Sequence, residues 1–270
     1  MDRVSITGIW RWFLALPNDS AAKTLGMAFV VTLTASVFVS ISAVTLQPVL
    51  RENLAREQQI QMQHMLQSLV GMSDKLNAEN LEELVVRLVD LQQGTFSDQY
   101  DPALFNQRVA ARDLELSVAL PLEADIAGIR RRSNYAPVFF LPANNGPPLI
   151  ILPVHGAGYQ SMIYAFLAIE PTTDTIAGLT IYEQSETPGL GAKILDPDWK
   201  SLWRGKKIFD ERRNIRIAVV RGQAQGPHEV DGISGATRTG NGVANMIRFW
   251  LGDLGFGPFL QNLKSGELEL

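Results

Sequence analysis

Residues 164–184 read YAFLAIEPTTDTIAGLTIYEQ, and this stretch points to the class of fold. Two apolar runs, YAFLAIEP and TIAGLTIYEQ, stand on either side of the polar sequence TTDT. Short runs rich in β-branched and aromatic residues, bounded by turn-forming residues, are typical of β-strands. Because so few residues separate the two runs, we predict that they pair as an antiparallel hairpin.

Further strand-like runs lie on both sides of this hairpin, each bounded by Pro, Gly or Asn. They are LELSVALPLE at 114–123, APVFFLP at 136–142, PLIILPV at 148–154 and IRIAVVRG at 215–222. We expect the triplet Arg130–Arg132, between two of these runs, to be a solvated loop. The run VANMIRFWLGDLG after Gly240 predicts a helix, with Asn241 as its candidate N-cap. The pattern therefore predicts an α+β fold with one mainly antiparallel sheet and flanking helices.

The 27 residues 24–50, TLGMAFVVTLTASVFVSISAVTLQPVL, contain no charged side chain. A helix needs about 20 mainly apolar residues to cross a bilayer, and Ser and Thr can return hydrogen bonds to its backbone. We predict a permanent transmembrane helix, with a cleaved signal peptide or a buried soluble helix as alternatives. The apolar run is longer than the ~7–15-residue core of a signal peptide. A small excess of basic residues before the span weakly favours a cytoplasmic N-terminus: Arg3, Arg11 and Lys23 against Arg51 and Arg56.

Two helices are predicted between this span and the first strand. Apolar residues recur at helical spacing over 49–72, and Asn80 with Glu83 predicts the N-terminus of a helix over 81–91. The chain is thus expected to consist of a cytoplasmic segment, a transmembrane helix, a helical membrane-proximal segment and a sheet-containing domain, at residues 1–23, 24–50, 51–112 and 113–270.

The composition excludes several classes of protein. Lys and Arg number 24 against 28 Asp and Glu, a net charge of -4, and this balance does not suit a nucleic-acid-binding protein. The absence of cysteine excludes disulfides, thiolate metal sites and a cysteine nucleophile. The three histidines lie far apart in the sequence and form no close-spaced metal motif. We therefore expect neither a metal site nor a catalytic histidine.

Residues 186–191, with the sequence ETPGLG, directly follow a predicted strand. Glycines allow the backbone to approach a ligand closely and to adopt a positive φ. A leucine held between them can pack on a flat aromatic surface, although an ordinary turn explains the same sequence. The candidate binding residues are Thr187, Gly189, Leu190 and Gly191.

A second glycine-containing stretch, DGISGATRT at 231–239, comes just before the predicted C-terminal helix. Its small residues place backbone N–H groups near a helix N-terminus, where an anion binds favourably, although a plain helix-entry loop is the alternative. Neither a P-loop nor a GxSxG motif is present. The candidate binding residues are Asp231, Ser234, Gly235, Ala236, Thr237 and Thr239.

The sequence DGISGAT resembles the flavinylation signature of the FMN-binding domain family. Four runs across residues 158–260 also resemble, in order, the family formed by the C subunits of the bacterial sodium-translocating NADH:quinone oxidoreductases. They are GYQSMIYAFLAIEP, GLTIYEQSETPGLG, GPHEVDGISGAT and FWLGDLGFGPFL.

This resemblance implies that Thr237 carries FMN through a phosphoester bond made by a separate Mg-dependent flavin transferase, and that both loops bind the flavin. Tyr159 is the candidate stacking residue, although the family usually has a Gly-Leu-Trp-like run where this chain has Gly158-Tyr159-Gln160. The implied role is an electron relay in a six-subunit complex of the bacterial inner membrane. That complex couples NADH oxidation and ubiquinone reduction to sodium export, and the large domain faces the periplasm.

Two other interpretations stay open at this point. One is the equivalent FMN-carrying protein of the related ferredoxin-linked, Rnf-type ion-pumping complex. The other is a membrane-anchored extracytoplasmic binding module without a redox role.

Overall fold

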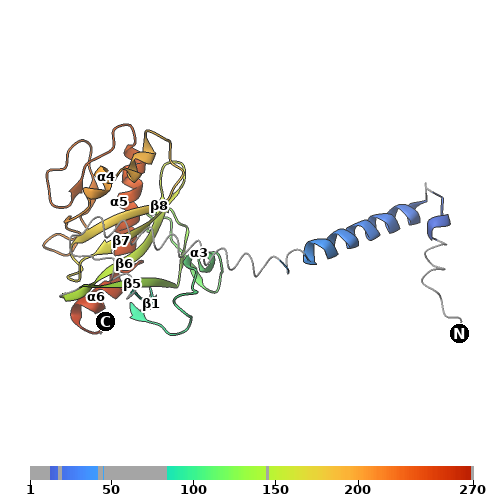
Figure 1. Cartoon of the computed structure of the whole chain (residues 1–270), viewed down its shortest axis with the longest axis horizontal. Coiled ribbons are helices and arrows are strands. Elements are labelled where there is room, and N and C mark those ends of the chain that lie inside the picture. Colours follow the sequence, from blue (N-terminus) through green and yellow to red (C-terminus); the bar gives the residue numbers. More distant parts are fainter. Residues whose placement is uncertain (1–12, 18–19, 42–44, 46–83, 144–145, 269–270) are drawn as a thin grey trace. The chain divides into compact units, whose positions relative to one another are not determined.

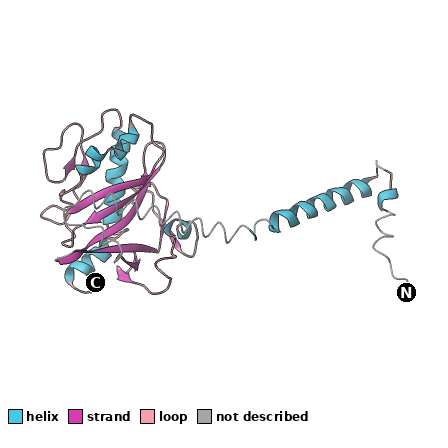
Figure 2. Cartoon of the chain, viewed as in Figure 1, coloured by secondary structure: helices cyan, strands magenta, loops and turns pink. Residues whose placement is uncertain are grey.

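The computed structural model describes residues 13–17, 20–41, 45, 84–143 and 146–268 (Figure 1, Figure 2). The chain divides into two compact units, Met1–Gln59 and Ile60–Leu270, and each is considered by itself. The helix predicted over 49–72 and most of the C-terminal end of the predicted membrane span lie outside the described residues.

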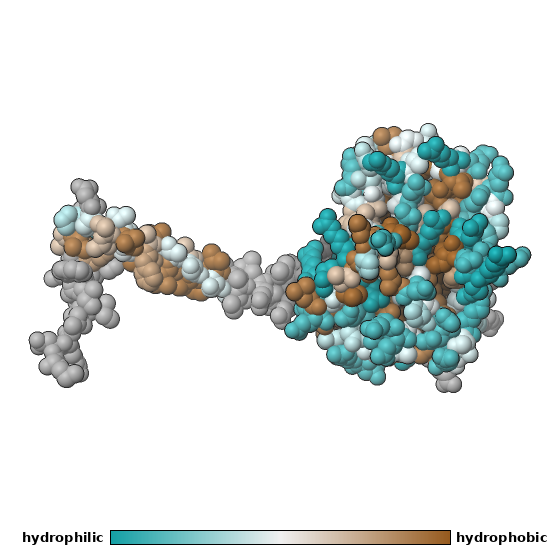
Figure 3. Space-filling view, turned by 180° about the vertical axis from the view of Figure 1, so that it is seen from behind, coloured by the Kyte–Doolittle hydropathy of each residue, from teal (hydrophilic) through white to brown (hydrophobic). Residues whose placement is uncertain are grey.

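The described part of the first unit is dominated by the helix Ala21–Ile41, which has a mean hydropathy of 2.0 and is long enough to cross a membrane. Brown, hydrophobic residues cover most of its surface in Figure 3. The hydroxyls of Thr32 and Thr34 donate to the carbonyls of Ala28 and Val30, both at 2.7 Å. Hydroxyls satisfied in this way are compatible with a lipid environment, and the predicted apolar helix is confirmed over this range.

The second unit is built on a six-stranded antiparallel sheet with the strand order β2-β1-β5-β6-β7-β8. The predicted hairpin is confirmed: Leu167 of β7 lies opposite Leu179 of β8. The strands are β1 (Val85–Asp90), β2 (Thr95–Phe96), β5 (Tyr135–Ala143), β6 (Gly146–Ala157), β7 (Met162–Ile169) and β8 (Ile176–Glu183).

Helix α5 (Thr237–Leu251), which follows the sheet in the chain, packs against β6 (Figure 1). Leu167 and Trp250, both fully buried, belong to the main core cluster on this face. The neighbouring strand residue Phe166 belongs to a second apolar cluster on the opposite face, together with Ile151. Burial on both faces explains why the strand sequences are almost continuously apolar.

The remaining elements are short, apart from α6 (Gly257–Ser265). A small antiparallel pair and a small parallel pair of strands lie outside the main sheet. These short elements are α3 (Gln107–Ala110), β3 (Ser117–Ala119), β4 (Arg131–Ser133), the 3₁₀ helix η2 (Gly191–Leu195), α4 (Pro197–Ser201), β9 (Ala218–Val219) and β10 (Glu229–Val230).

The helix predicted over 81–91 is wrong, because residues 85–90 form strand β1. Its sequence, VVRLVD, is rich in β-branched residues, and the strand pairs with β5 along its whole length. Tertiary pairing therefore overrides the helix start that Asn80 and Glu83 predicted. Since β1 and β2 belong to the main sheet, the predicted boundary between residues 112 and 113 falls inside this folded unit.

Two further local predictions are wrong. Arg131 and Arg132 form strand β4 rather than a solvated loop, and Arg132 is 5% exposed. Its guanidinium donates to the carbonyl of Leu254 at 2.8 Å, which lets a charged side chain be buried. Asn241 is not an N-cap, because α5 already begins at Thr237.

Candidate functional site

The loop of residues 231–236 leads from β10 into the first turn of α5. Gly235 has a φ of +77°, a conformation that glycine adopts without strain. The N–H of Ala236 donates to the carbonyl of Ile233 at 3.0 Å and closes the turn. Ala236 is also the N-cap residue, and no side chain caps the helix. The helix therefore presents first-turn N–H groups and the positive end of its dipole at Thr237.

Asp231 fixes this loop to its surroundings. Its Oδ1 atom accepts the N–H of Ala224 at 2.7 Å, and its carbonyl accepts the indole N–H of Trp199 at 2.9 Å. A Cβ atom built on Gly232 would lie 2.2 Å from the carbonyl oxygen of Val220, so the loop lies directly against the end of β9. Asp231, predicted as a cofactor contact, thus has a clear role in holding the loop.

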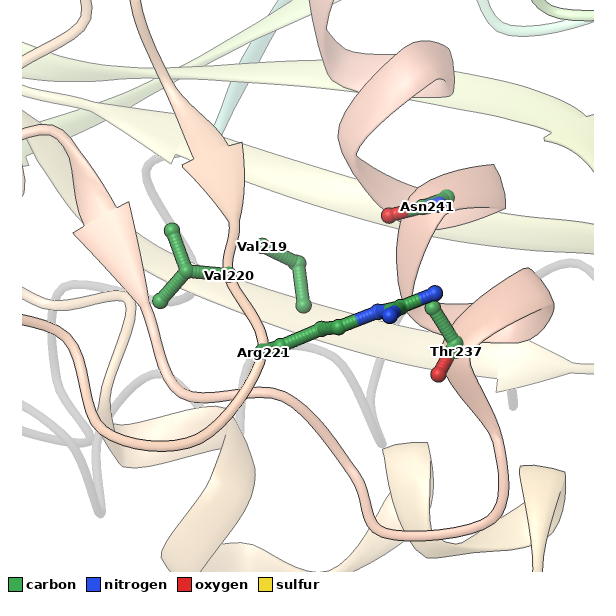
Figure 4. Close-up of a pocket in the computed structure, with 5 residues that line it drawn as sticks. All are labelled: Val219, Val220, Arg221, Thr237 and Asn241. Carbon is green, nitrogen blue, oxygen red and sulfur yellow. The ribbon is translucent and has the colours of Figure 1, made fainter.

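A cavity of about 210 Å³ opens beside the first turn of α5 (Figure 4). In Figure 4 the side chain of Arg221 extends toward Thr237. Thr237 and Ser234 are exposed. Arg221 was not predicted as a site residue, although it directly follows the apolar run IRIAVV; in the structure it lies two residues after the end of β9. The lining residues are Val219, Val220, Arg221, Thr237 and Asn241.

The two glycine-containing loops meet in space. A Cβ atom built on Gly235 would lie 3.0 Å from Cδ2 of Leu190. One built on Gly191 would lie 2.7 Å from the hydroxyl oxygen of Thr239. The loops therefore form one continuous surface, with Leu190 resting against the turn that leads to Thr237.

The loop of residues 187–191 is a tight turn at the surface. The carbonyl of Thr187 accepts the N–H groups of Leu190 and Ala192, both at 3.1 Å. Gly189 has a φ of +74°, and the space around its Cα is open. Leu190 is 46% exposed. Its side chain is available to an apolar ligand.

A buried carboxylate, Glu186, joins the loops to the hairpin between β6 and β7. Its Oε2 atom accepts the hydroxyl of Thr239 at 2.6 Å and the N–H of Tyr159 at 3.2 Å. Its Oε1 atom accepts the N–H groups of Gln160 and Ser161, both at 3.0 Å, and the Ser161 hydroxyl at 3.2 Å. Burial by itself would raise the pKa of this carboxyl, but the hydrogen bond from Thr239 and those from the backbone outweigh it and hold the pKa below its ordinary value.

Two residues predicted for the site, Thr239 and Tyr159, differ in their exposure to solvent. Thr239 is 2% exposed and its hydroxyl donates to Glu186. It is therefore a buried residue that holds the site together. Tyr159 is 55% exposed at the tip of the hairpin. The guanidinium carbon of Arg238 lies 5.4 Å from the centre of its ring.

The arrangement suits a ligand with an anionic end and a flat apolar end. A helix N-terminus without a side-chain cap, together with Arg221, can hold a phosphate. Leu190 and Tyr159 offer apolar and aromatic surface to a ring. The open space at Gly189 and the small residue at Gly235 let a ligand approach the backbone. These residues fit FMN, whose phosphate and isoalloxazine ring have those properties.

The comparisons agree with this chemistry. The FMN-binding domain family matches residues 158–252, which contain both loops and Tyr159. The C subunit of the Na(+)-translocating NADH-quinone reductase of Yersinia pestis is 41% identical over 261 residues, which cover 93% of this chain and 96% of that protein. Its counterpart from Vibrio alginolyticus is 42% identical, with coverages of 95% and 100%. The crystal structure of NqrC from Shewanella oneidensis is 33% identical, with a TM-score of 0.68, and covers 80% of this chain and 98% of that chain.

Proposed function

The chain belongs to the family formed by the C subunits of the Na(+)-translocating NADH-quinone reductases, and we propose that it holds FMN by a phosphoester bond to Thr237. It is a single-pass membrane flavoprotein that carries electrons within an oxidoreductase complex. The observation that supports the covalent bond is an exposed threonine hydroxyl at a helix N-terminus without a side-chain cap, beside a cavity lined by Arg221.

Attachment is a group transfer from FAD, for which we propose a separate flavin transferase. The bond between Thr237 Oγ1 and the flavin-side phosphorus forms while the bond from that phosphorus to the AMP portion breaks. The hydroxyl proton leaves with the AMP. The phosphate keeps one negative charge in the diester, and the first-turn N–H groups of α5 and the Arg221 guanidinium are suitably charged to hold it.

The ring end of the flavin is assigned to the exposed side chains around the 187–191 loop. Leu190 packs on one face of the isoalloxazine ring, Tyr159 stacks on the other face, and Thr187 supplies a hydrogen-bond partner. Aromatic stacking of this kind contributes about 0.5–1.5 kcal/mol beyond burial. Bound FMN supplies one-electron redox chemistry, and the protein supplies its attachment and orientation. NADH oxidation and quinone reduction are then tasks of the other members of a six-subunit complex.

The attachment is tested by producing the full chain together with a flavin transferase and then denaturing it. Wild type is expected to give a yellow fluorescent band on a denaturing gel, with the FMN mass on the peptide that contains Thr237. Thr237→Ala abolishes this fluorescence. Thr239→Ala keeps it, because that hydroxyl is buried against Glu186. FMN found on Thr239 or Ser234, or a wild type without covalent flavin, refutes the proposal.

We further propose that the residues after Leu50 lie in the periplasm. The excess of basic residues before the span supports this orientation, and an extracytoplasmic location gives covalent attachment a reason, because free FMN is dilute there. A reporter that is active only in the periplasm, fused after Leu270, should be active. A silent fusion, with an active cytoplasmic reporter at the same position, reverses the orientation.

A further inference from the structure

Glu186 is 4% exposed, yet none of the flavin contacts assigned above belongs to it. Its two carboxylate oxygens accept five hydrogen bonds, from three consecutive backbone N–H groups and two hydroxyls. An ionised carboxylate only accepts hydrogen bonds, whereas a protonated one carries an O–H that must donate. Because all five partners are donors, they suit the ionised form. The carboxylate is therefore the point at which three separate segments are tied together.

Each of the three segments contributes one part of the proposed flavin site. The hairpin between β6 and β7, whose N–H groups donate to Glu186, carries Tyr159. The loop that starts at Glu186 itself carries Leu190. The helix held through the Thr239 hydroxyl begins at Thr237, two residues earlier and about half a turn away.

Two glycines make room for this carboxylate. A Cβ atom built on Gly158 would lie 2.5 Å from Oε1 of Glu186, and one built on Gly191 would lie 2.9 Å from Oε2. Gly191, predicted from the sequence as a flavin contact, therefore has a second reason to lack a side chain. The space it leaves is occupied by the carboxylate of this chain.

We propose that Glu186 is the positioning residue of the flavin site, holding the hairpin of Tyr159, the loop of Leu190 and the first turn of α5 in one geometry. This inference rests on the proposed function, since those three segments are the ones assigned to the flavin. The carboxylate also places a buried negative charge within this frame of three segments.

Glutamine cannot replace Glu186 in this role. A carboxamide has one accepting oxygen and one NH₂ group, and the NH₂ group must face one of the two sets of donors. The Thr239 hydroxyl can rotate to accept, but a backbone N–H cannot. In either orientation of the amide, at least one N–H of residues 159–161 loses its acceptor.

The test compares Glu186→Gln with Glu183→Gln, a matched variant at the end of β8 whose carboxylate pairs with Arg108 at the surface. Hydrogen exchange is measured on the full chain made without the flavin transferase. We expect Glu186→Gln to raise the exchange rate of the 158–161 amides by about tenfold or more, and Glu183→Gln to leave it unchanged. After flavin loading, the midpoint potential of FMN is expected to rise in Glu186→Gln alone, because a negative charge that opposes reduction is lost.

If Glu186→Gln cannot be produced as folded protein, a second pair of variants at Thr239 tests the same inference. Thr239→Val replaces the hydroxyl by a methyl group and keeps the charge of Glu186, so it should raise the exchange rate of the 158–161 amides, and Thr239→Ser should restore the wild-type rate. The inference is overturned by unchanged exchange and potential in Glu186→Gln, by unchanged exchange in Thr239→Val, or by equal changes in Glu183→Gln. A wild type that carries no FMN refutes the proposed function instead, and the exchange data then still test the frame.

Discussion

Substituting Gly242 by alanine tests the close contact between α5 and the backbone at the end of β6. A Cβ atom built at this position would lie 2.5 Å from the carbonyl oxygen of Ala157 and 3.1 Å from Cα of Gly158. Both neighbours are backbone atoms of the hairpin that carries Tyr159, so neither can rotate away. Helix propensity alone predicts the opposite outcome, since Gly→Ala inside a helix stabilises it by about 1 kcal/mol.

The magnitude follows from the size of the overlap. The two atoms would have to separate by roughly 0.9 Å, from 2.5 Å to the 3.4 Å at which ordinary contacts begin. Overpacking a buried site costs about 1–3 kcal/mol, and a backbone neighbour favours the upper end. After subtracting the propensity gain, we expect Gly242→Ala to destabilise the protein by about 2 kcal/mol. The corresponding fall in Tm is about 4–8 °C for a domain of this size.

Thermal unfolding of the full chain in detergent, followed by circular dichroism, measures this shift. Gly240→Ala in the same helix is the control, because its added Cβ would meet Cγ1 of Val219 at 3.0 Å, a side-chain atom that can move. We expect the control to change Tm much less. If Gly242→Ala raises Tm, or matches the control, the close approach of α5 to the hairpin is not as described.

Three other substitutions probe the surroundings of the site. Burial lowers the pKa of His155 to about 4, below its unfolded value near 6.5, so wild type should lose stability as the pH falls from about 6.5 toward 4. His155→Gln should lose less over the same range, and parallel melting curves would contradict this. Trp199→Phe removes an indole N–H donor to the 231–236 loop and should cost about 1 kcal/mol in a denaturant titration, whereas an unchanged midpoint speaks against that hydrogen bond. Leu190→Ala should keep covalent flavin but change its absorption spectrum or midpoint potential, and the idea of a shared site fails if neither moves.

The elements that the sequence predicted correctly are those whose signal is contained in a short window. The hairpin of β7 and β8 follows from two apolar runs with a polar turn between them, and the membrane helix follows from an uninterrupted apolar stretch. The two candidate loops are also local features, because glycine, serine and threonine occur together next to predicted strands. The signal for each of these segments lies within a few consecutive residues, even though the loops are then held by distant partners such as Trp199 and Thr239.

Features that depend on contacts between residues far apart in the sequence could be known only from the tertiary structure. Asn80 and Glu83 resemble the start of a helix, yet residues 85–90 form a strand because they pair with β2 and β5. The buried guanidinium of Arg132 donates a hydrogen bond to a carbonyl more than a hundred residues away. Glu186 meets a threonine 53 residues later, and no local pattern marks either residue as half of a pair.

The membrane helix, the strand-rich domain and the loop with Thr237 could be predicted from the sequence because hydrophobic periodicity and turn chemistry act within a few residues. Only the folded chain decided that Glu186 binds Thr239 and that Arg221 lies beside Thr237, because the free energy of such contacts arises after distant segments have packed together.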